Sequence, residues 1–195
     1  MYTPKFQPQL VAGVPTGGDD CVVRSAQMGI DYATSGSLII KVADFRKRAG
    51  KQTGGLNTAQ LEQGVESYDT PTETNRYRDL RCKRFVEGEW SEITDFIRQG
   101  EYVCAWINYG WLNRQYPELS GDPKFTGTHC IGVLGYRFKD GQHQARIWDP
   151  LCDGRREGIW KGPRWWKQWV LKQACAATED VGEFRGAIIR TSSPL

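Results

Sequence analysis

An Asp-Gly pair between two strand-like runs constrains this chain more than any other feature of its sequence. The runs are HCIGVLGYRF at 129–138 and QARIWD at 144–149, and Asp140 and Gly141 lie between them. Because such a pair is a strong signal for a tight hairpin turn, we predict that the two runs are antiparallel neighbours.

The rest of the chain divides into a helical first half and a strand-rich second half. Apolar residues recur at helical spacing in four early segments, at 21–34, 42–49, 58–68 and 91–99. Further strand-like runs lie at 102–109 and 184–191, and Gly162 and Pro163 are expected to open a late helix. Helices followed by strands predict an α+β domain with N-terminal helices packed on a C-terminal antiparallel sheet.

Length and composition indicate one globular domain, spanning 1–195 with an extended Pro- and Gly-rich segment at 1–18. A formal net charge of +3 is too small to argue for nucleic acid, so the basic run at 76–84 is interpreted as a solvated loop or strand edge. No long apolar run predicts a membrane span, and no secretory signal is recognised, which favours synthesis in the cytoplasm.

Six cysteines without a CxxC pair are interpreted mainly as reduced thiols, with a disulfide network in a secreted form as the alternative.

The hairpin brings one histidine to a carboxylate. With the turn at 139–142, His129 and Asp149 lie at the same end of two neighbouring strands, whereas His143 lies beside the turn at the surface. A histidine oriented by a carboxylate is the base of a nucleophilic triad, because the carboxylate fixes the tautomer and stabilises the imidazolium. The alternative is a purely structural His–Asp pair.

Cys21 is the candidate nucleophile. It begins the first expected helix, and a thiol at a helix N-terminus beside an imidazolium ionises more readily than a free thiol. Cys130 follows His129 directly, so strand alternation points it to the other face. A zinc site using Cys21, His129, Cys130 or Cys152 is the rival chemistry, although the ligands lack paired spacing.

These residues resemble the papain-like cysteine peptidases, and most closely the branch that processes double-glycine leader peptides, with its stand-alone relatives. The resemblance covers roughly 14–152 and rests on the order Cys, His, Asp, on GTHCIGVLGY and on WDP. It implies a two-lobed papain-like fold with Cys21 as nucleophile, His129 as general base and Asp149 as the residue that orients the imidazole. It implies no metal and no cofactor.

The chain departs from the family beside the nucleophile. The family usually has an oxyanion-hole glutamine about six residues before the cysteine, where this chain has Pro15, and it prefers a small residue where this chain has Val22. Gln9 lies twelve residues upstream and reaches the site only if the intervening loop folds back. Gln9 and the backbone N–H of Cys21 are therefore the candidate oxyanion donors.

Two functions follow from the sequence. The first is a thiol-dependent peptidase or amidohydrolase acting on a peptide, with a cell-wall stem peptide or a Gly-rich peptide as the implied class. The alternative is a catalytically silent structural or binding module with protein partners in a larger assembly, such as a phage virion or tail. Acyl transfer to an amine, as in transglutaminases, would use the same triad.

The eight tryptophans divide between core and rim. Trp106, Trp148, Trp166 and Trp169 are expected in the core, the last two on one face of the late helix. Trp111 and Trp160 are expected in loops or at helix edges, where they could wall a substrate cleft.

Overall fold

The computed structural model describes residues 2–9, 19–68, 80–85, 90–152, 162–178 and 186–191. Its elements in chain order are α1 (Cys21–Ala33), α2 (Val42–Arg48), α3 (Thr58–Glu66), β1 (Leu80–Phe85), α4 (Trp90–Arg98), β2 (Tyr102–Asn108), α5 (Tyr109–Gln115), a 3₁₀ turn (Pro117–Leu119), β3 (Thr128–Lys139), β4 (Gln142–Trp148), β5 (Arg164–Lys167), α6 (Gln168–Ala176) and β6 (Gly186–Thr191).

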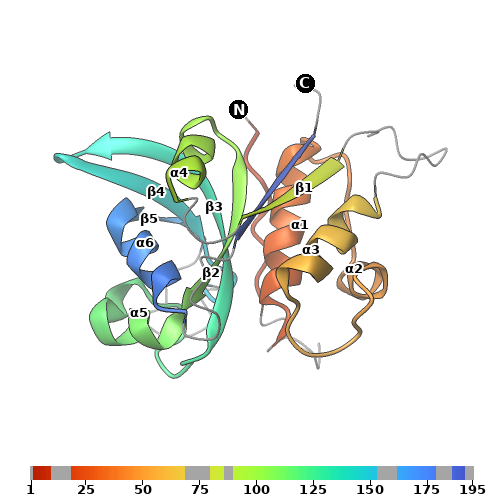
Figure 1. The fold of residues 1–195 in the computed structure, drawn as a ribbon, viewed down its shortest axis with the longest axis horizontal. Coiled ribbons are helices and arrows are strands. Elements are labelled where there is room, and N and C mark those ends of the chain that lie inside the picture. The colour runs from red at the N-terminus through yellow and green to blue at the C-terminus, as the bar shows by residue number, and fades with distance from the viewer. Residues whose placement is uncertain are drawn as a thin grey trace.

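A six-stranded antiparallel sheet in the order β1-β6-β2-β3-β4-β5 forms the centre of the molecule. Helices α1, α2 and α3 lie on one side of it, and α4, α5 and α6 lie on the other (Figure 1). Two hydrophobic cores result, one on each face of the sheet. The expected α+β class, with N-terminal helices on a C-terminal antiparallel sheet, is confirmed. Helices α4, α5 and α6 cover the second face of the sheet.

The central strand β2 is buried along almost its whole length because helices cover both faces. Tyr102 points from this strand toward α1. One glycine on α1 and one on β3 make room for its side chain. A Cβ atom at Gly29 of α1 would lie 2.7 Å from the Tyr102 ring, and one at Gly132 of β3 would lie 1.9 Å from its hydroxyl. Glycine at both positions therefore lets α1 and β3 approach the central strand closely.

The predicted hairpin is confirmed. Strands β3 and β4 pair with Lys139 opposite Gln142 and Phe138 opposite His143, and Asp140 and Gly141 form the turn with positive φ angles. The register shifts by one residue between Val133 and Tyr136. His143 is exposed beside the turn, as expected.

The expectation of a helix directly after Pro163 is wrong. Residues Arg164–Lys167 form strand β5 and pair with β4, and α6 begins only at Gln168. The sequence RWWK is compatible with an edge strand paired to β4. Successive side chains point to opposite faces, so Trp166 is buried in the core beside α5 and α6 while Trp165 stays half-buried. Trp169, which was expected on the same buried face as Trp166, is 41% exposed.

The basic run at 76–84 contributes part of β1, an edge strand, within the residues that the structure describes. Among these residues, no helix is long and apolar enough to cross a membrane.

Candidate functional site

Cys21 is the first residue of α1, where its thiol is half-buried. The other five cysteines are buried, and none of the six is in a disulfide. The helix begins here because the preceding residue, Asp20, is its N-cap residue with a non-helical backbone. Cys21 therefore combines a helix N-terminus with an accessible sulfur.

Arg46 holds the segment that precedes Cys21. Its guanidinium lies 2.7 Å from the carboxylate of Asp20, with both side chains almost fully buried. It also donates to the carbonyl of Asp19 at 3.0 Å and to the carbonyl of Gly54 at 2.9 Å. Arg46 thus ties the start of α1 to the loop before α3. The acidic side chain next to Cys21 is therefore neutralised by Arg46.

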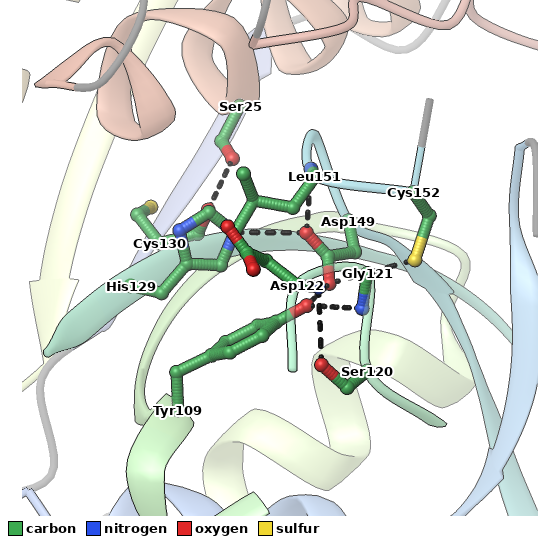
Figure 2. Close-up of polar contacts among 10 residues, drawn as sticks. All are labelled: Ser25, Tyr109, Ser120, Gly121, Asp122, His129, Cys130, Asp149, Leu151 and Cys152. Carbon is green, nitrogen blue, oxygen red and sulfur yellow. Dashed lines mark hydrogen bonds and ion pairs between the residues drawn. The ribbon is translucent and has the colours of Figure 1, made fainter. Parts of the chain in front are cut away.

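His129 and Asp149 meet at the end of β3 and β4, as the hairpin register predicts. The Nε2 atom of His129 lies 2.8 Å from Oδ1 of Asp149, and His129 is only 1% exposed (Figure 2). The other ring nitrogen, Nδ1, is buried and has no hydrogen-bond partner within the part of the chain that the structure describes. It is the nitrogen left for a reacting group.

Four donors surround the carboxylate of Asp149 (Figure 2). Besides the imidazole, the N–H of Leu151 donates to Oδ1 at 2.8 Å and the hydroxyl of Tyr109 donates to Oδ2 at 2.6 Å. The thiol of Cys152 lies 3.6 Å from Oδ2. Because these donors fix both oxygens, the carboxylate holds the imidazole in one orientation.

Tyr109 is itself held in place. The N–H of Gly121 donates to its hydroxyl at 2.6 Å (Figure 2). A Cβ atom at Gly121 would lie 2.5 Å from the backbone of Leu151, so only glycine allows the loop to approach the segment after Asp149 this closely. The rings of Tyr109 and Phe125 meet the His129 ring edge-on, at 4.9 and 5.9 Å between centroids. These contacts exclude water from the His–Asp pair.

The electrostatics of the pair favour its charged form. Burial lowers the pKa of His129, but the charge and hydrogen bond of Asp149 outweigh this effect. The interaction with Cys21 adds to the rise, and the pKa reaches about 10. Burial raises the pKa of Asp149, but the charge of His129 and the hydrogen bonds to the carboxylate bring it below its ordinary value.

We predict that the protein loses stability as the pH rises from about 6.5 toward 10. A histidine whose pKa is raised on folding stabilises the protein fully below its unfolded pKa of about 6.5, and that contribution disappears as the pH passes the folded value of about 10. The slope attributable to His129 approaches 1.4 kcal/mol per pH unit. Urea unfolding at pH 6.5, 8 and 9.5 measures it.

Asp149→Asn removes the charge that raises the His129 pKa and should flatten this slope, whereas His143→Gln at the exposed histidine should leave it as in the wild type. Equal slopes in the wild type and in Asp149→Asn would contradict the prediction.

A pocket of about 240 Å³ lies beside Cys21. Its apolar lining is formed by Val22, Leu56 and Trp106, and the rest of its lining consists of Cys21, Lys51, Gly55, Asn57, Gln60, Thr128 and Thr178. Thr128 directly precedes His129. The pocket therefore opens next to the thiol, and the chain continues from its wall into His129.

Of the two tryptophans expected at a substrate cleft, Trp111 does not line this pocket. Trp111 lies in α5, packed against the core on the other face of the sheet and 5.8 Å from the Tyr116 ring. Trp160 lies outside the described residues. Among the residues that the structure describes, the tryptophan in the pocket lining is Trp106, which was expected only as a core residue.

Gln9 lies near the site. The N-terminal segment runs along α1, with the N–H of Lys5 bonded to Asp31 at 2.7 Å, and it reaches the segment after β4. There the N–H of Gln9 donates to the carbonyl of Pro150 at 2.9 Å, next to Asp149, and Gln9 is buried. Pro15 lies outside the described residues.

Within the described ranges, no group of three or more His, Cys, Asp or Glu side chains could hold a metal ion. His129 and Cys130 belong to one strand, and the Cys130 side chain is part of the core beneath α1. Among the described residues, Cys21, His129, Cys130 and Cys152 therefore do not form the ligand group that the rival zinc site requires.

Sequence reasoning missed Arg46 and Tyr109. Nothing local marks Arg46, because it reads as one basic residue of a short helix that ends in Arg46, Lys47 and Arg48. Tyr109 had a usable signal: Asn108 caps α5 by accepting a hydrogen bond from the N–H of Trp111 at 2.8 Å. Recognising that cap would have ended the strand at Asn108 and opened a helix at Tyr109.

Comparison with known proteins gives two similarities of limited extent. No family model matches the chain. The urease accessory protein UreD of Acaryochloris marina is 25% identical over 141 residues, which cover 69% of this chain and 45% of that protein. The crystal structure of UfSP from C. elegans superposes with a TM-score of 0.49 and 13% identity, covering 99% of this chain and 34% of that one. The chain thus spans less than half the length of the curated relative it matches and about a third of the solved chain.

Proposed function

We propose that the protein is a papain-like, thiol-dependent peptidase or amidohydrolase with Cys21, His129 and Asp149 as its catalytic triad. The observation that supports this most is the buried 2.8 Å contact between His129 and Asp149, with the second ring nitrogen left for the thiol at the start of α1. A pocket next to Cys21 supplies room for a substrate.

The proposed reaction passes through a thioester. The Cys21 thiolate, paired with the protonated His129, attacks the carbonyl carbon of the scissile amide, forming a C–S bond while the carbonyl electrons move to the oxygen. Collapse of this intermediate breaks the C–N bond, and the departing amine takes a proton from Nδ1 of His129. Water then gives a proton back to His129 while its oxygen attacks the thioester carbon. The C–S bond breaks, the acid is released, and the thiolate–imidazolium pair is restored.

Asp149 acts in this scheme by holding the ring and stabilising its charged form. Its own full set of donors and its lowered pKa keep it ionised throughout. The N–H of Cys21 and the side-chain amide of Gln9 are the proposed donors to the oxyanion, on the basis of the position of Gln9 beside Pro150. Peptides, including Gly-rich and cell-wall stem peptides, remain the proposed substrate class.

Iodoacetamide labelling followed by mass spectrometry tests the thiol–imidazole pair. We expect Cys21 to react at pH 6 at least tenfold faster than the five buried cysteines, because an imidazolium beside it favours the thiolate. His129→Ala should reduce Cys21 labelling at pH 6 by at least tenfold and change it little at pH 9.5.

The matched control is His143→Ala, which removes the other, exposed histidine and should leave the labelling unchanged. If the pH profile of Cys21 labelling is the same in wild type and His129→Ala, the proposal fails and the silent binding module is favoured.

A further inference from the structure

One wall of the pocket beside Cys21 carries a positive charge. Among the described residues that line it, Lys51 is the only one with a charged side chain. Its ammonium donates to the carbonyl of Gly55 at 2.6 Å, which holds the side chain against the loop that forms the wall. An ammonium group has three N–H donors, so this bond leaves Lys51 able to donate to a ligand.

Two amide side chains extend the same wall with further donors. The Oδ1 atom of Asn57 accepts from the N–H of Gln60 at 2.9 Å, and Oε1 of Gln60 accepts from the N–H of Asn57 at 3.0 Å. This capping box engages both side-chain oxygens at the start of α3. The NH₂ groups of Asn57 and Gln60 are therefore what the two amides offer to the pocket.

No acidic side chain offsets this charge in the lining that the structure describes. The carboxylate nearest in sequence to Cys21, that of Asp20, is bound by Arg46 at 2.7 Å and fully buried. The imidazole of His129 adds a second positive charge next to the thiol, because its pKa is raised. Val22, Leu56 and Trp106 form the apolar remainder.

We infer that this pocket selects substrates with a carboxylate group close to the scissile bond, and that Lys51 is the residue that binds this carboxylate. The inference deepens the proposed function and rests on it. An amide donor pair and an ammonium on one wall match the two oxygens of a carboxylate. A neutral group of the same size would leave the Lys51 charge unmatched.

A pair of alkylating agents tests the inference without requiring turnover. Iodoacetate and iodoacetamide differ in charge and scarcely in size, so the ratio of their rates at Cys21 reports the local charge. Lys51→Gln should lower the iodoacetate-to-iodoacetamide ratio roughly three- to tenfold, as expected for unit charges several ångströms apart at a partly exposed site. Lys51→Glu should lower it further, and Lys51→Arg should preserve it.

The matched control is Lys139→Gln, which removes a lysine at the far end of the β3–β4 hairpin and should leave the ratio unchanged. The contribution of His129 is present in every variant and cancels in the comparison. An unchanged ratio in both Lys51→Gln and Lys51→Glu would overturn the inference.

Two substrates, the p-nitrophenyl esters of N-acetyl-Glu and N-acetyl-Gln, extend the test to turnover. Wild type should favour the Glu ester in kcat/KM, Lys51→Gln should abolish the preference, and Lys51→Glu should reverse it. Loss of the preference with intact Cys21-dependent hydrolysis supports the inference. Absence of any preference in wild type, with His129-dependent labelling of Cys21 intact, overturns it and leaves the proposed function standing. The labelling experiment detects failure of the proposed function separately: in that case, Cys21 labelling does not depend on His129.

Discussion

Replacing Arg46 with methionine should lower the free energy of unfolding by about 3–5 kcal/mol, the usual effect of leaving one member of a buried ion pair without its partner. The loss is large because Asp20 is fully buried, 2.7 Å from Arg46, and the variant removes the cation of this ion pair. The carbonyls of Asp19 and Gly54 lose a donor as well. Urea unfolding at pH 7 measures the change.

Two further variants separate the charge effect from loss of packing. Arg46→Met combined with Asp20→Asn removes both charges and should recover a substantial part of the stability. Arg98→Met removes an exposed partner of Asp95 and should cost less than 1 kcal/mol. A loss below 1 kcal/mol in Arg46→Met would show that the ion pair does not hold the start of α1.

Local patterns predicted most of the helices and strands. The helix that begins at Cys21 and the strands on either side of Asp140 and Gly141 agree with the structure to within a few residues. Apolar periodicity and the Asp-Gly turn are both local signals, so neighbouring sequence alone was enough to read them. In the hairpin, the same signals also predicted the register to within a few residues, but not its shift between Val133 and Tyr136.

Strand β5, which sequence reasoning missed, depends on tertiary contacts. The segment Arg164–Lys167 follows a proline typical of a helix start, but pairing with β4 keeps it extended. A strand of four residues gains its stability from the neighbouring strand and from burial of Trp166, neither of which a local pattern records.

The candidate site divides in the same way. His129 and Asp149 were brought together by the hairpin register, which the sequence encodes locally. The partners that secure them come from distant segments: Tyr109 lies 40 residues before Asp149, and Arg46 lies 26 residues after Asp20. Such contacts are fixed only when the whole chain folds. The same holds for Lys51, which reaches the Cys21 pocket on a loop with no distinctive sequence.

Changing Asp149 to asparagine should reduce kcat for a fluorogenic Gly-Gly anilide by about 10³–10⁴-fold, with a much smaller effect on KM. Asparagine keeps the size of the side chain but loses the charge that raises the His129 pKa to about 10, and it presents an NH₂ group to one of the donors that now bind the carboxylate. The imidazole then loses both its fixed orientation and the stabilisation of its protonated form, which donates the proton to the leaving amine.

Tyr109→Phe is the matched comparison, because it removes one hydrogen bond to Asp149 and keeps the contact between Asp149 and His129. We expect it to reduce kcat by roughly tenfold, in line with a loss of about 1–2 kcal/mol for one hydrogen bond to a charged group. Circular dichroism at the assay temperature checks that each variant is folded. If folded Asp149→Asn retains kcat within tenfold of wild type, Asp149 does not orient the catalytic imidazole.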